Sequence, residues 1–598
     1  MPALLRGLGP WVREVNAATL RADAQAALLA AVLVLPQGIA FATLAGLPAA
    51  WGLYSAVVPT LIAALAGSSR HVLTGPTNAL SLALAASLAP LAAAGSAEYL
   101  RLALVMTLLI GLIQVAVALL RLGVLTHFVA PSVLLGFTSG AAVLIGWHAL
   151  VELGVWPRPD VPALAVGALT LALAFTVRRL WPRAPALMLA LVGGTLAAVA
   201  AQRFGGVELQ RVGLLPQALP VWNVPALQWA DVPRLATIAL ALTIVALGQT
   251  VAISKALAQR SGQALDVNRE CLGQGLANTV GAFFSCFASC GSLNRSVPHL
   301  QAGARTPLAG VFAALMLVAL VALAAPLLAW IPLAAISGLL LLVAVSLVDR
   351  AAWRELVRLD RREAAVATGT LLATLLLPLQ VAVLAGVAAS LVLYLHRTAH
   401  PALRTMGFAL PPAPGVHRPF VVLEPGAPEC PQLKLLRVEG SVWFGAEAHV
   451  DDALQALHDA PAPARHLLVM GKSMNFIDAA GAALWERERL RRLASGGDLY
   501  FHRPRPEVLR VWQASGYTAR LGTDHVFADK RSAIAAIVPR LDGAICAACR
   551  LRVFEECVHQ PGGVATETVT AAVAVTAAVT VTAAGAESPP APTAPPLR

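Results

Sequence analysis

One arginine of this chain stands where a charged side chain is costly. Arg295 belongs to a Ser-rich run, Cys290 to Pro298 (CGSLNRSVP), between two long apolar stretches. An arginine at membrane depth costs roughly 2.5–3.5 kcal/mol on insertion scales, so it is usually retained to bind an ion or a substrate. A matching break, Thr74 to Asn78 (TGPTN), occupies the corresponding place in the first half. Paired breaks indicate a transporter's binding site, and the arginine predicts that the bound species is an anion.

The composition requires a membrane protein. Of the 598 residues 58% are hydrophobic and 13% are charged, and the mean hydropathy is +0.72. Soluble proteins contain about 25% charged residues, so the chain holds a dozen or more spanning helices and one soluble domain. The net charge of +12 does not indicate nucleic-acid binding, because the arginines fall largely in short loops where they set topology. We expect no cleavable signal in Met1 to Ala22, which lacks a small-residue cleavage site after an apolar core.

About fourteen apolar segments are predicted between Asp23 and His396, several of them shorter than the ~20 residues of a full span. Positively charged loops alternate with nearly uncharged ones, which places both termini in the cytoplasm. A polar insert near Phe204 to Asp231 separates two sets of seven. Since seven is odd, the halves run in opposite directions, which is an inverted repeat. The approximate segment centres are Val32, Thr60, Ala83, Ile110, Leu135, Leu171, Val192, Leu242, Gly281, Val297, Leu315, Leu339, Leu371 and Ala388.

The chain changes character after His396. We assign residues 1–22 to an N-terminal cytoplasmic segment, 23–397 to the transmembrane domain and 398–432 to a Pro-rich linker. Residues 433–540 read as a soluble α/β domain, with strands at Leu433 to Val438 and His466 to Met470. Residues 541–560 contain cysteines, and the tail 561–598, rich in Ala, Val, Thr and then Pro, is expected to be disordered.

Several motifs, in order along residues 18 to 540, resemble the sulfate permease (SulP) family of anion transporters. The resemblance implies an all-α polytopic membrane domain of about 14 segments in a 7+7 inverted repeat, with core and gate subdomains and a cytoplasmic α/β STAS domain. It also implies a multi-pass protein of the cell inner (cytoplasmic) membrane, commonly a homodimer, that transports sulfate or a related anion. The motifs are Pro36 to Phe41, Pro48 to Tyr54, Gly75 to Asn78, Asp266 to Glu270 and Gly291 to Gly310.

The resemblance makes the third and tenth segments half-helices whose N-termini face each other, near Thr77 to Ser81 and Leu293 to Ser296. Each N-terminus supplies unpaired N–H groups and about +0.5 charge, so with Arg295 the site carries about +2, which suits a divalent oxyanion without excluding monovalent ones. The alternative for the arginine is snorkelling to the headgroups. The predicted substrate-binding residues at these N-termini are Thr77, Asn78, Ser292, Leu293, Arg295 and Ser296, with the hydroxyls as hydrogen-bond donors.

The first segment is expected to contribute Gln37 and Phe41, which are four residues apart and share a helical face. The resemblance places both beside the anion, with the amide donating a hydrogen bond and the ring forming a wall. The alternative is packing between helices, because an intramembrane Gln often bonds to a neighbouring helix.

The eighth segment departs from the family pattern at Gln249. Many bacterial and plant relatives carry an acidic residue at the aligned position, and a buried carboxylate there binds a proton or sodium to couple transport. Gln249 cannot titrate, and no Asp or Glu lies inside the predicted first, third or tenth segment. We therefore expect anion exchange or uniport. Proton-coupled sulfate symport through another residue remains the alternative.

The predicted STAS domain lacks a phosphorylation site known from its fold. In bacterial anti-sigma-factor antagonists a phosphorylatable serine follows an aspartate, whereas alanine follows Asp478 here. We expect Asp478 to cap the next helix. The domain is then structural or regulatory, with a possible cytoplasmic partner.

The seven cysteines do not form a secreted disulfide framework, since three lie in membrane segments and four near the C-terminus. Cys546, Cys549 and Cys557 with His559 offer zinc ligands. However, the Cys-x-His pair is unusual and Leu551 to Glu556 looks helical. We therefore predict structural or free thiols and no metal.

The sequence favours a secondary carrier of sulfate or a related small inorganic anion, with no cofactor. Carriers of bicarbonate, chloride or a dicarboxylate would differ only in the pocket side chains. A nucleobase transporter is disfavoured, because those proteins use acidic residues where this chain has arginine and serine. An anion sensor that signals through the STAS domain is an alternative of another class, which binding without flux would favour. No nucleophile–base pair or catalytic metal cluster indicates an enzyme.

Overall fold

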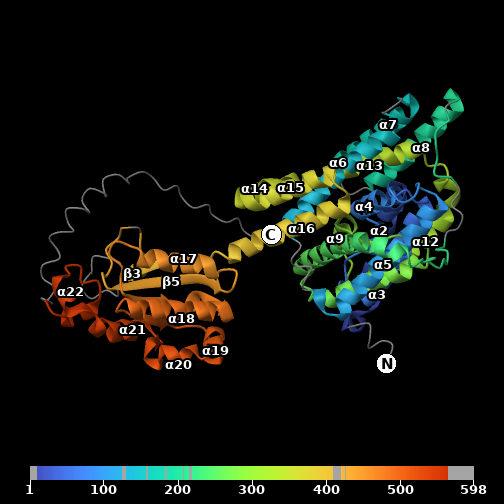
Figure 1. Ribbon diagram of the computed structural model, residues 1–598. Coiled ribbons are helices and arrows are strands. Elements are labelled where there is room, and N and C mark those ends of the chain that lie inside the picture. Colours follow the sequence, from blue (N-terminus) through green and yellow to red (C-terminus); the bar gives the residue numbers. More distant parts are fainter. Residues whose placement is uncertain are drawn as a thin grey trace, which may run out of the picture. The chain divides into compact units, whose positions relative to one another are not determined.

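The computed structural model describes residues 10–562 except 124–129, 156–158, 182–184, 207, 214–218, 409–418 and 425. The first residues and nearly all of the tail expected to be disordered lie outside this range. The chain divides into two compact units, residues 1–392 and 393–598, and each is described by itself (Figure 1).

The first unit is mainly helical and has a helix at each of the fourteen predicted segments. Nine helices of the described part are long and apolar enough to cross a membrane. The fourteen are α2 (Ala17–Leu44), α3 (Ala49–Ala66), α4 (Asn78–Leu88), α5 (Ala97–Leu119), α6 (Pro131–Glu152), α7 (Val161–Leu180), α8 (Ala186–Gly205), α9 (Asp231–Ser261), α10 (Val267–Ala282), α11 (Leu293–Gln301), α12 (Leu308–Leu328), α13 (Leu333–Leu347), α15 (Arg361–Leu376) and α16 (Leu379–Thr398).

A further short helix, α14 (Arg350–Leu359), precedes α15 and was not expected. It buries no residue, and Asp349 caps it by accepting hydrogen bonds from two backbone N–H groups of its first turn. The charged cluster that the sequence assigns to a loop is therefore partly helical, because a good N-cap and a high share of helix formers start a helix in it.

The helices pack in two groups that match the expected core and gate subdomains. In the core, α2 packs on α3 and α12, and α10 packs on α3 and α5. In the gate, α6 packs on α13 and α15, and α7 packs on α8 and α13. Figure 1 shows α6, α7, α8 and α13 together, apart from α3, α5 and α12.

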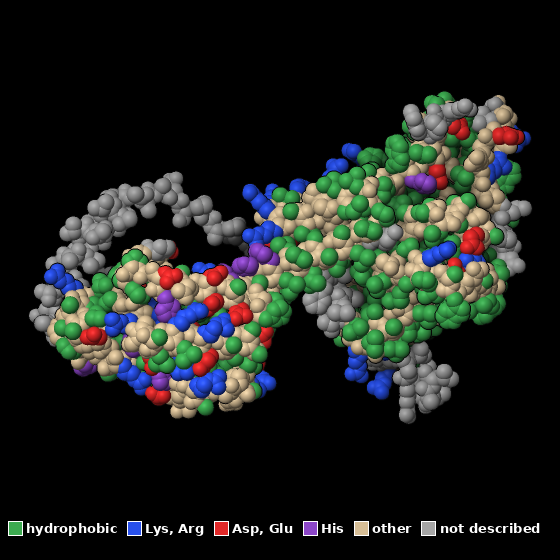
Figure 2. Space-filling view, viewed as in Figure 1, with side chains coloured by type: hydrophobic (Ala, Val, Ile, Leu, Met, Phe, Trp, Pro, Cys, Tyr) green, Lys and Arg blue, Asp and Glu red, His purple; other side chains and the backbone are tan. Residues whose placement is uncertain are grey.

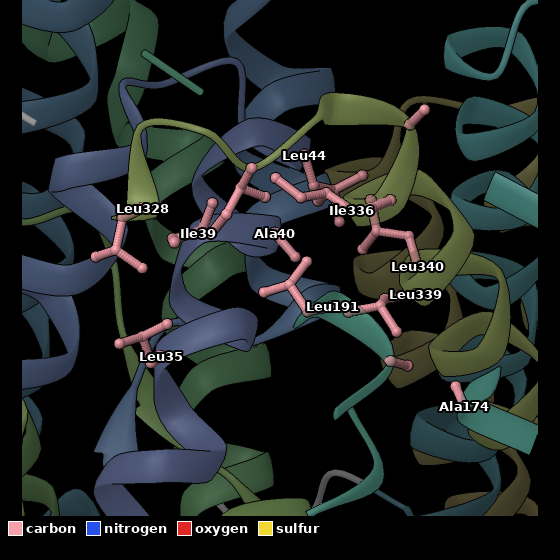
Figure 3. Packing of buried hydrophobic residues seen from close by; sticks show 14 of the residues in the cluster. Leu35, Ile39, Ala40, Leu44, Ala174, Leu191, Leu328, Ile336, Leu339 and Leu340 are labelled. Carbon is pink, nitrogen blue, oxygen red and sulfur yellow. The ribbon is translucent and has the colours of Figure 1, made fainter. Parts of the chain in front are cut away.

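Helix α2 joins the two groups through an apolar face. Leu35, Ile39 and Ala40 of α2 are at most 5% exposed and belong to one cluster with Leu191 of α8 and Leu339 of α13. Figure 3 shows Ala40 close to Leu191 and Leu339, while Leu35 and Ile39 lie on the side of Leu328. Between membrane helices such contacts are stabilised by close van der Waals packing, because lipid is as apolar as the side chains. The contact between core and gate on this face is therefore apolar and tightly packed.

Helix α2 begins earlier than expected and includes an acidic residue. Asn16 caps it by accepting hydrogen bonds from two N–H groups of the first turn, at 3.0 Å each. Asp23 therefore lies inside the helix and is fully buried, so the expectation that the first segment holds no Asp or Glu is wrong. Its carboxylate accepts from the backbone N–H groups of Arg305 at 2.7 Å and Thr306 at 3.1 Å. This side chain ties the start of α2 to the segment before α12.

The second unit is an α/β domain, consistent with the expected STAS domain. Its sheet has the order β4-β3-β5-β6-β8-β9, with β7 also paired to β5. The contacts β5–β6, β6–β8 and β8–β9 are parallel. The strands are β3 (Ala402–Phe408), β4 (Phe420–Val422), β5 (Leu433–Val442), β6 (His466–Met470), β7 (Met474–Ile477), β8 (Leu499–His502) and β9 (Val526–Phe527); the main helices are α17 (Glu447–His458), α18 (Ala479–Ala494), α19 (Pro506–Ala514) and α21 (Lys530–Ile537).

Two details of this domain bear on the sequence predictions. The interval 398–432, expected to be a linker, contributes β3, which pairs antiparallel with β5, and β4. Asp478 caps α18 as predicted, accepting from the N–H of Gly481 at 3.0 Å. The strands before β5 were missed because their partners are separated from them in sequence.

Surface composition distinguishes the two units. Lys, Arg, Asp and Glu side chains are scattered over the visible face of the second unit, whereas the first unit presents mostly hydrophobic side chains (Figure 2). Large side chains such as Leu119, Leu323 and Leu376 are more than two-thirds exposed on its helices. Contiguous exposed apolar surface on this scale indicates contact with lipid.

Candidate anion-binding site

Two short strands hold the two polar breaks against each other. β1 (Thr74–Gly75) and β2 (Cys290–Gly291) form an antiparallel pair in which Thr74 lies opposite Gly291 and Gly75 opposite Cys290. Helix α4 begins at Asn78 and α11 at Leu293, directly after these strands. Both half-helices therefore start from one crossing inside the core.

The first turns of both half-helices offer backbone donors. Thr77 and Ser292 occupy the N-cap positions in extended conformation, and neither side chain caps its helix. The first N–H groups of a helix have no partner within the helix, and the N-terminus carries a partial positive charge. The Asn78 side-chain oxygen accepts from the N–H of Ala79 at 2.8 Å, so one donor of α4 is already engaged. The remaining N–H groups of the two N-termini at one crossing form a favourable place for an anion.

Arg295 supplies a full positive charge at this crossing. Its side chain is 2% exposed, and Nη2 donates to the backbone oxygen of Pro76 at 2.8 Å. Nε has no hydrogen-bond partner, and within the described residues no carboxylate forms an ion pair with this guanidinium. Burial of this kind is inconsistent with snorkelling. A buried cation without a counter-ion is unfavourable, and a bound anion would remove that cost.

The space beside the guanidinium is small. A cavity of about 10 Å³, room for about one water molecule, lies between Arg295, Val34 of α2, Thr60 of α3 and Leu317 of α12, with further apolar side chains around them. Gln37, which is half-buried, and Phe41, which is 5% exposed, do not line this cavity. Their predicted contact with the anion stays a prediction.

The position of Gly75 in β1 leaves no room for a side chain, because the guanidinium of Arg295 lies against it. A Cβ at this position would lie 2.5 Å from Nη1 of Arg295. We expect Gly75→Ala to displace the guanidinium and to reduce transport at least tenfold, while a control at an unhindered glycine, Gly369→Ala, leaves transport unchanged. Uptake of labelled anion into proteoliposomes measures both variants. Equal activity of the Gly75→Ala protein would show that the arginine's position does not matter.

The remaining predicted residues surround the crossing with different contacts. The Ser296 hydroxyl accepts from the backbone N–H of Leu73 at 2.9 Å, so it is engaged in holding β1. The amide nitrogen of Asn78 and the hydroxyl of Ser81 are buried without a hydrogen-bond partner. Leu293 is 49% exposed. Unpaired buried donors are costly, so Asn78 and Ser81 are available to a ligand.

Gln249 lies next to the crossing. The Cys290 thiol donates to its side-chain oxygen at 3.3 Å, and the same sulfur lies 3.3 Å from the Thr77 hydroxyl. The protonation of a titratable group at position 249 would therefore depend on the partial positive charge at the N-terminus of α4. This placement is consistent with a coupling position.

A polar network behind the crossing was not anticipated. The Gln274 side-chain oxygen accepts from Thr74 and Thr250, at 3.3 Å each, while its nitrogen donates to the carbonyl of Ser289 at 2.7 Å. Asn278, one turn later, also donates to Ser289 at 3.0 Å. The four-residue spacing of these amides on α10 was the available signal. The network fixes both β strands from one helix.

Comparison with protein families gives a match over more than half of the chain. A model of the sulfate permease family matches residues 20–156 and 156–370. A probable sulfate transporter of Mycobacterium tuberculosis is 30% identical over 543 residues, which cover 88% of this chain and 96% of that protein. The chloroplastic sulfate transporter 4.1 of Arabidopsis thaliana is 29% identical over 470 residues, 74% of this chain and 68% of that protein.

Solved structures share the fold. The inward-facing structure of murine Slc26a9, an anion transporter, aligns with a TM-score of 0.78 at 20% identity, covering 90% of this chain and 95% of that chain. The transmembrane domain of the cyanobacterial bicarbonate transporter BicA aligns with a TM-score of 0.56 at 24% identity, covering 63% of this chain and 98% of that chain.

Proposed function

Because the chain belongs to the sulfate permease family, and is therefore a multi-pass membrane transporter of anions and not an enzyme, we propose that it carries sulfate. The observation that carries this proposal is Arg295, a buried cation at the N-termini of two half-helices, for which the described residues provide no counter-ion. Together these groups supply about two positive charges, which balance a divalent oxyanion. The sulfate transporters among its relatives support this substrate.

The test is uptake of labelled sulfate into proteoliposomes that contain the purified protein. Saturable uptake, with a lower apparent affinity for bicarbonate, chloride and dicarboxylates as competitors, supports the proposal. Preferential competition by one of these anions would assign the site to that anion. Specific sulfate binding without flux would instead favour an anion sensor that signals through the C-terminal domain.

The transport mode follows from Gln249. A neutral amide beside Cys290 and Thr77 cannot exchange a proton, so the proposed mode is anion exchange or uniport. Uptake should depend on internal anion or on membrane potential, and an inward proton gradient should leave it unchanged.

Gln249→Glu should make uptake respond to the proton gradient, because a carboxylate at this place titrates next to the anion site. The control is Gln249→Asn, which stays neutral and should remain insensitive to the gradient. A proton-driven wild-type protein would contradict this assignment of the coupling position.

A buried group of three ionisable side chains favours proton-coupled symport as a second candidate. His71 and His299 are 5% and 1% exposed, and both rings contain buried nitrogens without a well-formed hydrogen bond. Burial lowers the pKa of the His71 ring to about 4, so this ring is neutral at neutral pH, and the fully buried Asp23 only partly offsets that effect. Asp23 also interacts electrostatically with His299. His299 follows Arg295 by one turn of α11. Protonation of either imidazole would give Asp23 a counter-ion. It would also change the charge about one helical turn from Arg295.

Under this second candidate, an inward proton gradient drives uptake by the wild-type protein, and His299→Asn abolishes that drive while exchange of internal for external sulfate continues. Loss of exchange as well would indicate a structural role for the ring. Uptake independent of the gradient in the wild type excludes the candidate.

The proposed assembly is a homodimer in the cytoplasmic membrane with both termini in the cytoplasm. Light scattering of the detergent-solubilised protein should give twice the mass of one chain. Tags at both ends should be protected from protease in right-side-out vesicles. A monomeric mass would contradict the homodimer. Cleavage of either tag would contradict a cytoplasmic position of that terminus.

A further inference from the structure

Four cysteines from two distant parts of the sequence meet in the C-terminal domain. Cys430, Cys546, Cys549 and Cys557 line one small cavity together with residues that include Gln432 and Arg552. Cys430 precedes the Cys-x2-Cys pair by more than a hundred residues, so the sequence pattern did not connect it to the others. His559, the fourth ligand considered from sequence, does not line this cavity. The fourth candidate ligand in the structure is therefore the thiol of Cys430 and not the imidazole of His559.

The two segments that carry these thiols are fastened to each other by one side chain. The Gln432 amide oxygen accepts from the N–H of Asp542 at 2.9 Å, and its nitrogen donates to the carbonyl of Asp542 at 3.1 Å. The same nitrogen lies 3.3 Å from the sulfur of Cys546. These hydrogen bonds hold the segment around Gln432 against the segment around Asp542, and so fix the positions of the cysteines on both segments.

Backbone groups point at two of the sulfur atoms. In the Cys-Pro-Gln-Leu turn, the backbone groups of Gln432 and Leu433 hydrogen-bond to Cys430, and the backbone of Phe554 does so to Cys557. N–H groups directed at sulfur stabilise a thiolate, as outer-shell contacts do for metal ligands. The region around Cys557 is a short 3-10 helix over Glu555–His559, preceded by irregular chain, and not the helix expected from Leu551 to Glu556.

The burial of these cysteines favours neutral thiols. Burial raises the pKa of Cys430 to about 11 and also raises the pKa of Cys546 and of Cys557. At neutral pH these thiols are protonated, and a metal ion that binds them must displace their protons. Arg552 lies at the edge of the cavity, where its charge offsets part of the negative charge of metal-bound thiolates.

We propose that Cys430, Cys546, Cys549 and Cys557 bind one Zn²⁺ as four thiolates. Four soft sulfur ligands, with no histidine, carboxylate or open position in the cavity lining, fit a closed tetrahedral zinc site. Within the described residues no three such side chains already stand in metal-binding geometry, so the sulfur atoms must turn inward on the ion. Binding releases one proton for each thiol that becomes a thiolate. The ion would fasten the strand β5 to the segment after α21.

The experiment uses the full-length protein, purified in detergent without chelator, and measures metal content by elemental analysis. We expect about one zinc per chain. Replacement by Co²⁺ should produce thiolate-to-cobalt charge-transfer bands and the visible bands of a tetrahedral site. Cys430→Ser and Cys549→Ser should each lose zinc and these bands, whereas the matched control His559→Ala should retain both.

Three results would overturn the proposal. They are metal-free protein that gives no tetrahedral cobalt spectrum on titration, a disulfide between any two of the four cysteines in the mass spectrum, and loss of zinc in His559→Ala. Because the cysteine variants could unfold, the wild-type protein supplies an independent measurement. Cobalt titration of chelator-treated wild type should release protons and raise the thermal unfolding midpoint, and absence of both effects would contradict the site.

Discussion

Replacing Arg295 with glutamine should abolish high-affinity sulfate binding while leaving the protein folded. The guanidinium is the cation at the crossing of β1 and β2, and it makes a hydrogen bond to Pro76 at 2.8 Å with Nε still unpaired. A hydrogen bond to a charged group contributes roughly 1.5–3 kcal/mol. Since 1.4 kcal/mol is a factor of ten in affinity, we expect about a 10- to 100-fold weaker apparent affinity for one lost contact, and more if two are lost.

The stability of the same variant provides a second readout. A buried charge without a partner destabilises the ligand-free protein, so Arg295→Gln should unfold at the same or a higher temperature than the wild type without sulfate. Sulfate should raise the wild-type midpoint through binding to the folded state, and this shift should vanish in the variant. Arg295→Lys, which keeps the charge but not the planar fork, should retain part of the shift. Unchanged sulfate affinity in the folded glutamine variant would refute the assignment of Arg295.

Replacing Glu270 with alanine should destabilise the transport domain and disturb β1. Its carboxylate is 6% exposed and accepts from the backbone N–H groups of Ser68 at 2.9 Å and Ser69 at 2.8 Å, and from the Ser254 hydroxyl at 2.9 Å. Alanine leaves these donors without an acceptor, at about 1–3 kcal/mol each. We therefore expect a loss of roughly 3–5 kcal/mol in unfolding free energy, seen as a lower thermal midpoint.

The loop held by Glu270 leads directly into β1, so transport should fall together with stability. Glu270→Gln retains one acceptor oxygen and should show a smaller loss of both. The control is Glu98→Gln, which removes an exposed carboxylate that pairs with Arg101 and should change the midpoint little. A Glu270→Ala protein with the wild-type midpoint and transport rate would show that the loop is held by other contacts.

The helical architecture was accessible from sequence because its signals are local. Apolar length predicted the fourteen segments, and polar or Pro-containing breaks predicted that α4 and α11 are short. Helix starts were harder to place. α2 begins at Ala17 because Asn16 caps it, which brought Asp23 inside a helix that was expected to hold no acidic residue.

The candidate site was predicted in part. The two breaks and Arg295 were identified because a charge in an apolar run is conspicuous. Gln274 and Asn278 were not, because an amide within a helix gives no indication of its partner until the neighbouring strands are placed. Val34 and Thr60, which line the space beside Arg295, have no sequence signal at all.

The sequence by itself determined which segments are apolar enough to enter the membrane and where the two half-helices begin, and it singled out Arg295 as the candidate cation of the site. These features depend on side-chain hydropathy and on helix termination, both of which act within a few residues. Only the tertiary structure decided that Gly75 lies against Cys290, that β3 joins β5, and that Cys430 shares a cavity with Cys546, Cys549 and Cys557. Such contacts join residues far apart in the chain, and they arise from packing and strand pairing that no local pattern encodes.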